Sequence, residues 1–146
     1  ARLIAHSAGE NEQFCELIEH AAPVYDIGKI GIPNTIVERE QDKLQDYEAQ
    51  MLMRHTIIGH DILRDSPSRY MQFAARIALS HHEHYDGSGY PQGLRKEKIP
   101  PEAAIVAIVD AFDDLVCPES PHTPGINAKP WSISANSVAH ALTLII

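Results

Sequence analysis

The sequence has few cysteines, few aromatic residues and no long apolar run. Cys15 and Cys117 are its two cysteines, too few for a disulfide framework, although pairing between the two stays open. No segment approaches the roughly 20 consecutive apolar residues of a membrane span, and no signal peptide is visible. These absences favour a cytoplasmic protein in a reducing compartment, without a membrane partner.

Positive charge is also scarce. There are 12 Lys and Arg residues against 20 Asp and Glu residues, which gives a net charge of −8 at pH 7. Proteins that coat nucleic acid are basic, so we exclude a nucleic-acid polymer as the partner. An anionic substrate would need a local source of positive charge, and bound metal ions are one such source.

The length and composition suit one domain. The chain has 146 residues, of which 44% are hydrophobic, and this is enough for a real core. We therefore expect a single domain over residues 1–146. Since the sequence starts at Ala1 rather than at a methionine, we also expect it to be a fragment of a longer protein, with a sensory or regulatory domain upstream.

Apolar residues recur at helical spacing, whereas the alternation typical of strands is nearly absent. Three helical stripes are Phe14, Leu17, Ile18 and Ala21, then Met51, His55, Ile58 and Ile62, then Ala74, Ile77, Ala78 and His81. Asn11 is a candidate N-cap for the first stripe. Residues 103–116 are apolar nearly all round, as in a central buried helix. The pattern predicts an all-α bundle.

Glycine and proline mark the connections. They predict loops at residues 28–34 and 83–99, and a long irregular connection at 118–130. A last short helix is expected from about residue 134 onwards.

The run His-His-Glu-His-Tyr-Asp-Gly-Ser-Gly-Tyr-Pro at residues 81–91 is the most informative part of the chain. It places adjacent imidazoles at the end of an apolar helical pattern, and imidazole is the commonest metal ligand in proteins. Gly87 and Gly89 allow backbone angles that other residues avoid, and Pro91 favours an extended conformation at Tyr90. The run therefore combines candidate metal ligands with a shaped loop.

Several polar residues stand where packing would prefer apolar ones. They are Asp26, His55, His81 and Asp110, and each lies in an apolar pattern. A single histidine on an apolar face is more often a hydrogen-bonded core residue than a ligand, but four such positions together with His82 favour a shared metal site. Histidine and carboxylate ligands suit Fe, Mn, Ni or Zn. Two carboxylates suggest a bridged two-metal site, which activates water and clamps a phosphoester.

Four ordered blocks resemble the HD-GYP family, a branch of the HD metal-dependent phosphohydrolases. Its members typically hydrolyse the bacterial second messenger cyclic di-GMP. The blocks are residues 22–33, 54–59, 81–91 and 93–113. The resemblance implies an all-α, HD-domain-like helical bundle with a loop-rich Gly-Tyr-Pro segment. It also implies a metal-dependent phosphodiesterase that acts on cyclic di-GMP or a related phosphoester.

The resemblance further implies roles for individual residues. Those that correspond to family metal ligands are Asp26, His55, His81, His82 and Asp110. They would hold two divalent transition-metal ions, iron first and manganese as the alternative, with Asp26 as a bridging, catalytic ligand. Lys29 corresponds to a lysine that contacts the substrate phosphate and stabilises charge there.

The Gly-Tyr-Pro loop has two interpretations. We expect residues 86–94, with Gly89, Tyr90 and Pro91, to form an exposed surface that contacts diguanylate cyclase (GGDEF) domains, as the resemblance implies. Loops of this composition run over surfaces and carry function more often than packing. The alternative is that Tyr90 packs inside the domain and fixes the loop.

Two positions depart from the family pattern. Tyr25 stands where the family has the histidine of its His-Asp pair, and Glu119 stands in a stretch where the family usually has arginines. A neutral phenol is a poor metal ligand, so the second ion should be held more loosely than the first. We expect Tyr25 to lower activity, metal affinity or both. Two other functions stay open: a weakly catalytic binding module, and an HD-type hydrolase of another phosphoester.

Overall fold

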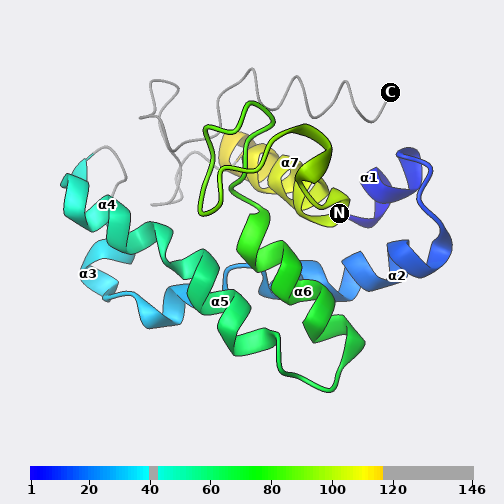
Figure 1. Cartoon of the computed structure of the whole chain (residues 1–146), viewed down its shortest axis with the longest axis horizontal. Helices are drawn as coiled ribbons and strands as arrows, with labels where there is room; N and C mark the ends of the chain where they lie inside the picture. Colours follow the sequence, from blue (N-terminus) through cyan, green and yellow to red (C-terminus); the bar gives the residue numbers. More distant parts are fainter. Residues whose placement is uncertain (40–42, 117–146) are drawn as a thin grey trace.

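The computed structural model describes residues 1–39 and 43–116 (Figure 1). Within these residues all regular structure is helical, which confirms the prediction of an all-α fold. The helices in chain order are α1 Arg2–Ser7, α2 Glu12–Ala21, η1 Ala22–Val24, η2 Ile27–Gly31, α3 Asn34–Val37, α4 Asp46–Met53, α5 His55–Leu63, α6 Arg69–Ser80, η4 Lys96–Lys98 and α7 Pro101–Val116.

Helix α6 lies at the centre of the fold and packs against α5, α2 and α7 (Figure 1). Its predicted apolar stripe is confirmed, since Ala74, Ile77 and Ala78 are completely buried. Phe73 on the same helix meets Phe14 of α2 edge to face, with ring centroids 5.4 Å apart. The small alanine side chains let neighbouring helices come close, and the larger residues fill the remaining space.

Helix α2 forms as its sequence predicts. The side chain of Asn11 accepts a hydrogen bond from the Phe14 amide at 3.0 Å and so caps the helix. Ile18 and Ala21 on the predicted stripe are completely buried.

The predicted stripe from Met51 to Ile62 is not one continuous face. The helix breaks at Arg54, whose amide donates to the Met51 carbonyl, three residues back, in a turn tighter than an α-helix. Met51, before the break, is 37% exposed, while His55, just after it, is buried. Ile62, farther along the same helix as His55, is 49% exposed. Periodicity alone does not reveal such a turn.

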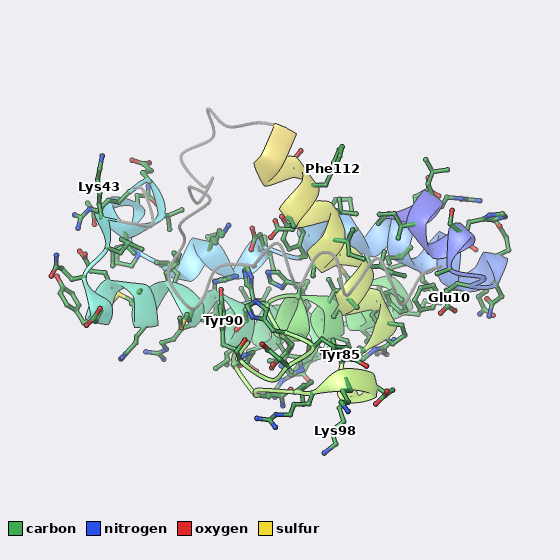
Figure 2. The ribbon with its side chains drawn as sticks, turned by 90° about the horizontal axis from the view of Figure 1, so that it is seen from above. Glu10, Lys43, Tyr85, Tyr90, Lys98 and Phe112 are labelled. Atoms are coloured by element: carbon green, nitrogen blue, oxygen red, sulfur yellow. The ribbon has the colours of Figure 1, made fainter. Side chains whose placement is uncertain are left out.

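Helix α7 is buried or half-buried all round over residues 102–111, which agrees with the prediction, whereas Phe112 near its end is 63% exposed and projects outward (Figure 2). One further prediction needs correction. Residues 28–34, predicted to be a loop, contribute instead to η2 and α3. The irregular segment at 118–130 and the last helix from about residue 134 lie outside the described residues. Each helix of the described part is too short or too polar to cross a membrane.

The backbone of η2 rests directly on α5. A Cβ added at Gly28 would lie 1.9 Å from the His55 carbonyl oxygen and 2.5 Å from the Gly59 nitrogen. A Cβ at Gly59 would lie 3.2 Å from the Gly28 nitrogen. Two glycines therefore let these segments touch, and this contact holds Asp26, just before η2, next to the start of α5.

Replacing Gly28 with alanine should destabilise the protein strongly. The added methyl group would meet backbone atoms, which cannot move aside as a side chain can. We expect a loss of at least about 2 kcal/mol, as for an overpacked core, and a fall of about 6 °C or more in the melting temperature.

Gly31→Ala is the matched control for this change. It adds the same methyl group to η2, but opposite the Ile58 side chain, with its nearest atoms at 3.1 Å. Thermal unfolding of both variants tests the prediction. Equal melting temperatures for the two would show that the Gly28 contact does not constrain the fold.

Candidate metal centre

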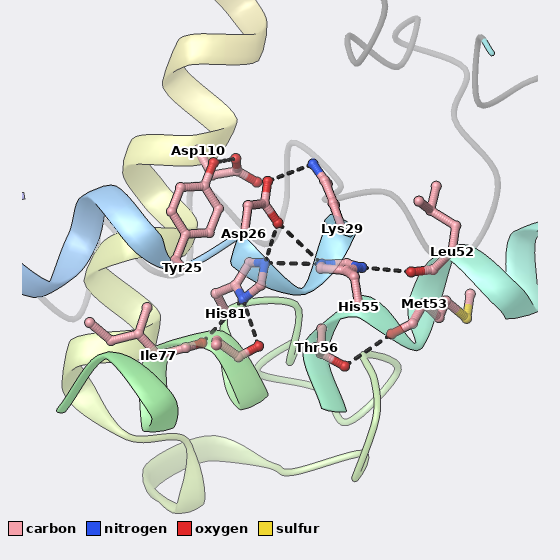
Figure 3. Close-up of polar contacts among 11 residues, drawn as sticks. Tyr25, Asp26, Lys29, Leu52, Met53, His55, Thr56, Ile77, His81 and Asp110 are labelled. Atoms are coloured by element: carbon pink, nitrogen blue, oxygen red, sulfur yellow. Dashed lines mark hydrogen bonds and ion pairs between the residues drawn. The ribbon is translucent and has the colours of Figure 1, made fainter. Parts of the chain in front are cut away.

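Four of the five predicted metal ligands come together. Asp26 precedes η2, His55 begins α5, and His81 follows the end of α6 (Figure 3). His82 is the next residue in the chain. Each of the four offers one ligand atom, and these atoms all lie within 4.8 Å of one another. We call these residues, Asp26, His55, His81 and His82, the four-residue group. His55 and His81 are at most 1% exposed.

Backbone carbonyls orient two of the imidazoles. Nδ1 of His55 lies 2.6 Å from the Leu52 oxygen, and Nδ1 of His81 lies 3.1 Å from the oxygens of both Ile77 and Ala78. A carbonyl only accepts, so each Nδ1 carries a hydrogen, and Nε2 is the ring nitrogen left to bind a metal. The two Nε2 atoms are 3.5 Å apart.

Within the four-residue group, His55 and His82 have shifted pKa values, and both rings are neutral at pH 7. Burial, and then the neighbouring His81, lowers the pKa of His55 to about 4. Burial also holds the pKa of His82 well below its ordinary value. Neutral imidazole is the form that binds a metal.

Asp26 contributes a charged oxygen to the same point. Its Oδ1 lies 3.3 Å from His55 Nε2 and 3.6 Å from His81 Nε2. Burial raises the pKa of the Asp26 carboxyl, but His81, Lys29 and His55 together outweigh burial and hold that pKa well below its usual range. The carboxylate is therefore ionised.

The donors of the four-residue group fit a transition-metal ion. Asp26 Oδ1 is buried and has no hydrogen-bond partner among the described residues, and the same is true of His82 Nδ1. An anionic oxygen and the Nε2 atoms of His55 and His81 thus converge on one point. A metal cation bound there would satisfy the buried oxygen. Imidazole nitrogens with a carboxylate oxygen suit iron, manganese or zinc.

Lys29 lies where the sequence predicts, beside Asp26. Its Nζ donates a hydrogen bond to Asp26 Oδ2 at 2.5 Å, and the lysine side chain is 28% exposed. One carboxylate oxygen thus faces the imidazoles, and the other is bound by an ammonium group that solvent can reach.

Asp110, the fifth predicted ligand, is not part of the four-residue group. Its Oδ1 accepts a hydrogen bond from the Tyr25 hydroxyl (Figure 3). The Tyr25 ring packs edge to face against His81, with centroids 4.9 Å apart and an interplanar angle of 81°. The residue that replaces the family's histidine therefore contacts both a metal-ligand candidate and Asp110.

The Tyr90 ring packs against two of the histidines. Its ring stacks on His82 with centroids 4.8 Å apart and 23° between the planes, and it meets His55 edge to face at 6.4 Å. Burial raises the pKa of its phenol well above the ordinary value. This packing fits the alternative that Tyr90 fixes the loop, while contact of the loop with a partner stays a prediction.

Glu83 fixes the conformation of the Gly-Tyr-Pro loop, although the sequence analysis gave this residue no role. It is 5% exposed, and its two carboxylate oxygens accept hydrogen bonds from the Gln92 amide at 2.7 Å and the Leu94 amide at 2.8 Å. Because Glu83 directly follows His82, these bonds tie the Gly-Tyr-Pro loop to the ligand segment. The signal in the sequence was a carboxylate flanked by histidines, but its partners are backbone amides, which leave no side-chain pattern.

Comparison with known proteins agrees with this geometry. Residues 1–130 match a family model described as "HD domain". The chain belongs to the HD-domain family. Its resemblance to the HD-GYP branch of that family is also confirmed, because the relatives described next are phosphodiesterases of cyclic dinucleotides.

Three relatives show the extent of the similarity. The chain is 47% identical over 116 residues to a Xanthomonas campestris protein named cyclic di-GMP phosphodiesterase response regulator RpfG, covering 80% of this chain and 30% of the relative. It is 45% identical over 127 residues to a Thermotoga maritima cyclic di-GMP phosphodiesterase, covering 87% and 33%. It is 41% identical over 112 residues to a Vibrio cholerae 3'3'-cGAMP-specific phosphodiesterase, covering 77% and 21%. The chain thus spans a third or less of their lengths.

Glu83→Gln should loosen the Gly-Tyr-Pro loop. The amide group that replaces one carboxylate oxygen can only donate, so it would face a backbone N–H without a partner. We expect a loss of about 1–3 kcal/mol in stability and faster hydrogen exchange at the Gln92 and Leu94 amides. Thermal unfolding and hydrogen exchange measured by NMR test this.

Glu97→Gln is the control, since Glu97 is an exposed glutamate of η4 in the same loop-rich segment. It should leave both measurements unchanged. Unaltered exchange at Leu94 in Glu83→Gln would rule out the role given to Glu83.

Proposed function

We propose that this chain is the catalytic domain of a metal-dependent phosphodiesterase that hydrolyses cyclic di-GMP. The observation that carries the proposal is the four-residue group, whose ligand atoms, three imidazole nitrogens and a charged carboxylate oxygen, all lie within 4.8 Å of one another. The names of the similar Xanthomonas and Thermotoga proteins support the choice of substrate.

The residues of the site would have different roles. Asp26, His55, His81 and His82 would hold a metal ion, with iron as the first choice and manganese as the alternative. When bound, metal ions of this kind lower the pKa of water and offset the charge of a phosphate group. The family resemblance adds a second ion, for which Asp26 and Asp110 are the remaining residues of the predicted set.

Lys29 would bind the substrate phosphate. Its ammonium group lies beside Asp26 and is partly open to solvent, so a phosphate oxygen can approach it without displacing a buried residue. Hydrogen-bond donation from Lys29 would then stabilise the negative charge that grows on the phosphoryl oxygens during hydrolysis. In a chain of net charge −8, this local charge also helps to attract an anionic substrate.

A second candidate substrate is 3'3'-cGAMP. The Vibrio cholerae relative described above is named for that activity, and the two cyclic dinucleotides share the phosphodiester that the site would cleave. The fold alone does not choose between them.

We also propose the wider setting of this domain. A regulatory domain upstream is supported by the short share of each relative that the chain spans, and by the name "response regulator" of the Xanthomonas protein. The loop with Gly89, Tyr90 and Pro91 would contact GGDEF domains, and the protein would act in the cytoplasm, where cyclic dinucleotide signalling takes place.

Turnover under anaerobic conditions with Fe(II) or Mn(II) tests the function. We expect cleavage of cyclic di-GMP that is faster than cleavage of a generic phosphodiester such as bis(p-nitrophenyl) phosphate, with 3'3'-cGAMP measured alongside. Binding of the dinucleotides without cleavage would support a binding module instead. Cleavage of the generic ester alone would support a hydrolase of another phosphoester.

Lys29→Met should lower the turnover of cyclic di-GMP by about 100-fold, as when one charge-stabilising donor is removed from an active site. Metal content is measured in parallel, because Lys29 also contacts Asp26. Lys98→Met, which removes an exposed lysine of η4, is the matched control and should turn over normally. Equal rates for the two variants would remove Lys29 from the mechanism.

A further inference from the structure

Tyr25 and Asp110 are bound to each other at the edge of the four-residue group. The Tyr25 hydroxyl donates to Asp110 Oδ1, across 85 positions of sequence. In the family pattern these two positions provide a histidine and an aspartate, and both would be ligands. Here a hydrogen bond joins them, so Oδ1 of Asp110 already accepts the hydrogen of the Tyr25 hydroxyl.

The Tyr25 side chain is not free to turn away without cost. Its ring packs edge to face against His81, which is completely buried. Moving the hydroxyl off Asp110 would break a hydrogen bond to a carboxylate, which is among the stronger kinds, and would disturb that ring contact as well.

Asp26 shows the same restriction independently. A carboxylate that bridges two ions offers one oxygen to each, but only Oδ1 of Asp26 faces the imidazoles. Oδ2 accepts a hydrogen bond from Lys29 at 2.5 Å. Both carboxylates that would hold a second ion therefore have an oxygen engaged by a hydrogen-bond donor of this chain.

We propose that this centre holds one metal ion, at Asp26, His55, His81 and His82, and that the Tyr25–Asp110 hydrogen bond takes the place of a second ion. The proposal rests on the proposed function only in requiring that the four-residue group binds metal. The family resemblance implies a centre with two ions, whereas the proposed centre of this chain holds one. Lys29 then supplies the other positive charge beside Asp26.

The number of bound ions tests the proposal directly. The full chain is loaded anaerobically with Mn(II), freed of excess metal and analysed by elemental analysis and electron paramagnetic resonance. We expect about one ion per chain, as the single set of four donors allows, with the six-line signal of an isolated Mn(II) ion. Two ions with an exchange-coupled signal would overturn the proposal while leaving the proposed function intact. Absence of bound ions after loading would overturn both.

Variants at Tyr25 identify the cause. Tyr25→His supplies an imidazole and releases Asp110, so a second ion and a coupled signal should appear. Adding Asp110→Asn to that variant should return the centre to one ion. Tyr47→His is the control, since it adds a histidine at a tyrosine that is 65% exposed on α4, and it should keep one ion.

Each variant is first compared with the parent by thermal unfolding, and the parent count stands whether or not a variant folds. If folded Tyr25→His still binds one isolated ion, the Tyr25–Asp110 pair is not what limits the centre, and the proposal fails.

Discussion

The central constraint on this structure is an ionised Asp26 whose Oδ1 is buried beside the imidazoles of His55 and His81. The carboxylate charge is balanced by Lys29 on one oxygen only, while the other oxygen faces His55 and His81 across 3.3 and 3.6 Å. A polar group left in this state is unfavourable in a buried, low-dielectric site unless a cation completes it. We therefore expect a bound metal ion to stabilise the site, because it would satisfy the buried oxygen.

The surrounding fold brings these groups together from three places in the chain. Gly28 lets η2 touch α5 and so sets the distance between Asp26 and His55. The end of α6 presents His81, whose Nδ1 is bound by carbonyls of its own helix. Tyr90 stacks on His82, and Glu83 accepts hydrogen bonds from the loop that carries Tyr90. Packing thus turns each ring toward one point.

Sequence patterns revealed the parts of this arrangement that depend on local spacing. The stripe of α6 was predicted correctly because that helix is buried along one face for its whole length, which places His81 among alanines. The stripe through His55 was wrong as a continuous face, since the turn at Arg54 depends on backbone hydrogen bonds. His55 was nevertheless a correct member of the group, because its neighbours made a polar residue conspicuous.

Other contacts cannot be inferred from the spacing of residues in the sequence. Tyr25 and Asp110 are distant in sequence, and a phenol that binds a carboxylate has the same apolar neighbours as one that packs in a core.

The most direct test of the account is the melting temperature with Mn(II) added and then chelated. At 100 times the dissociation constant the ion should add about 2.7 kcal/mol, raising the melting temperature by several degrees. His81→Gln should abolish this shift, and a parent protein that melts at the same temperature with and without metal would contradict the account.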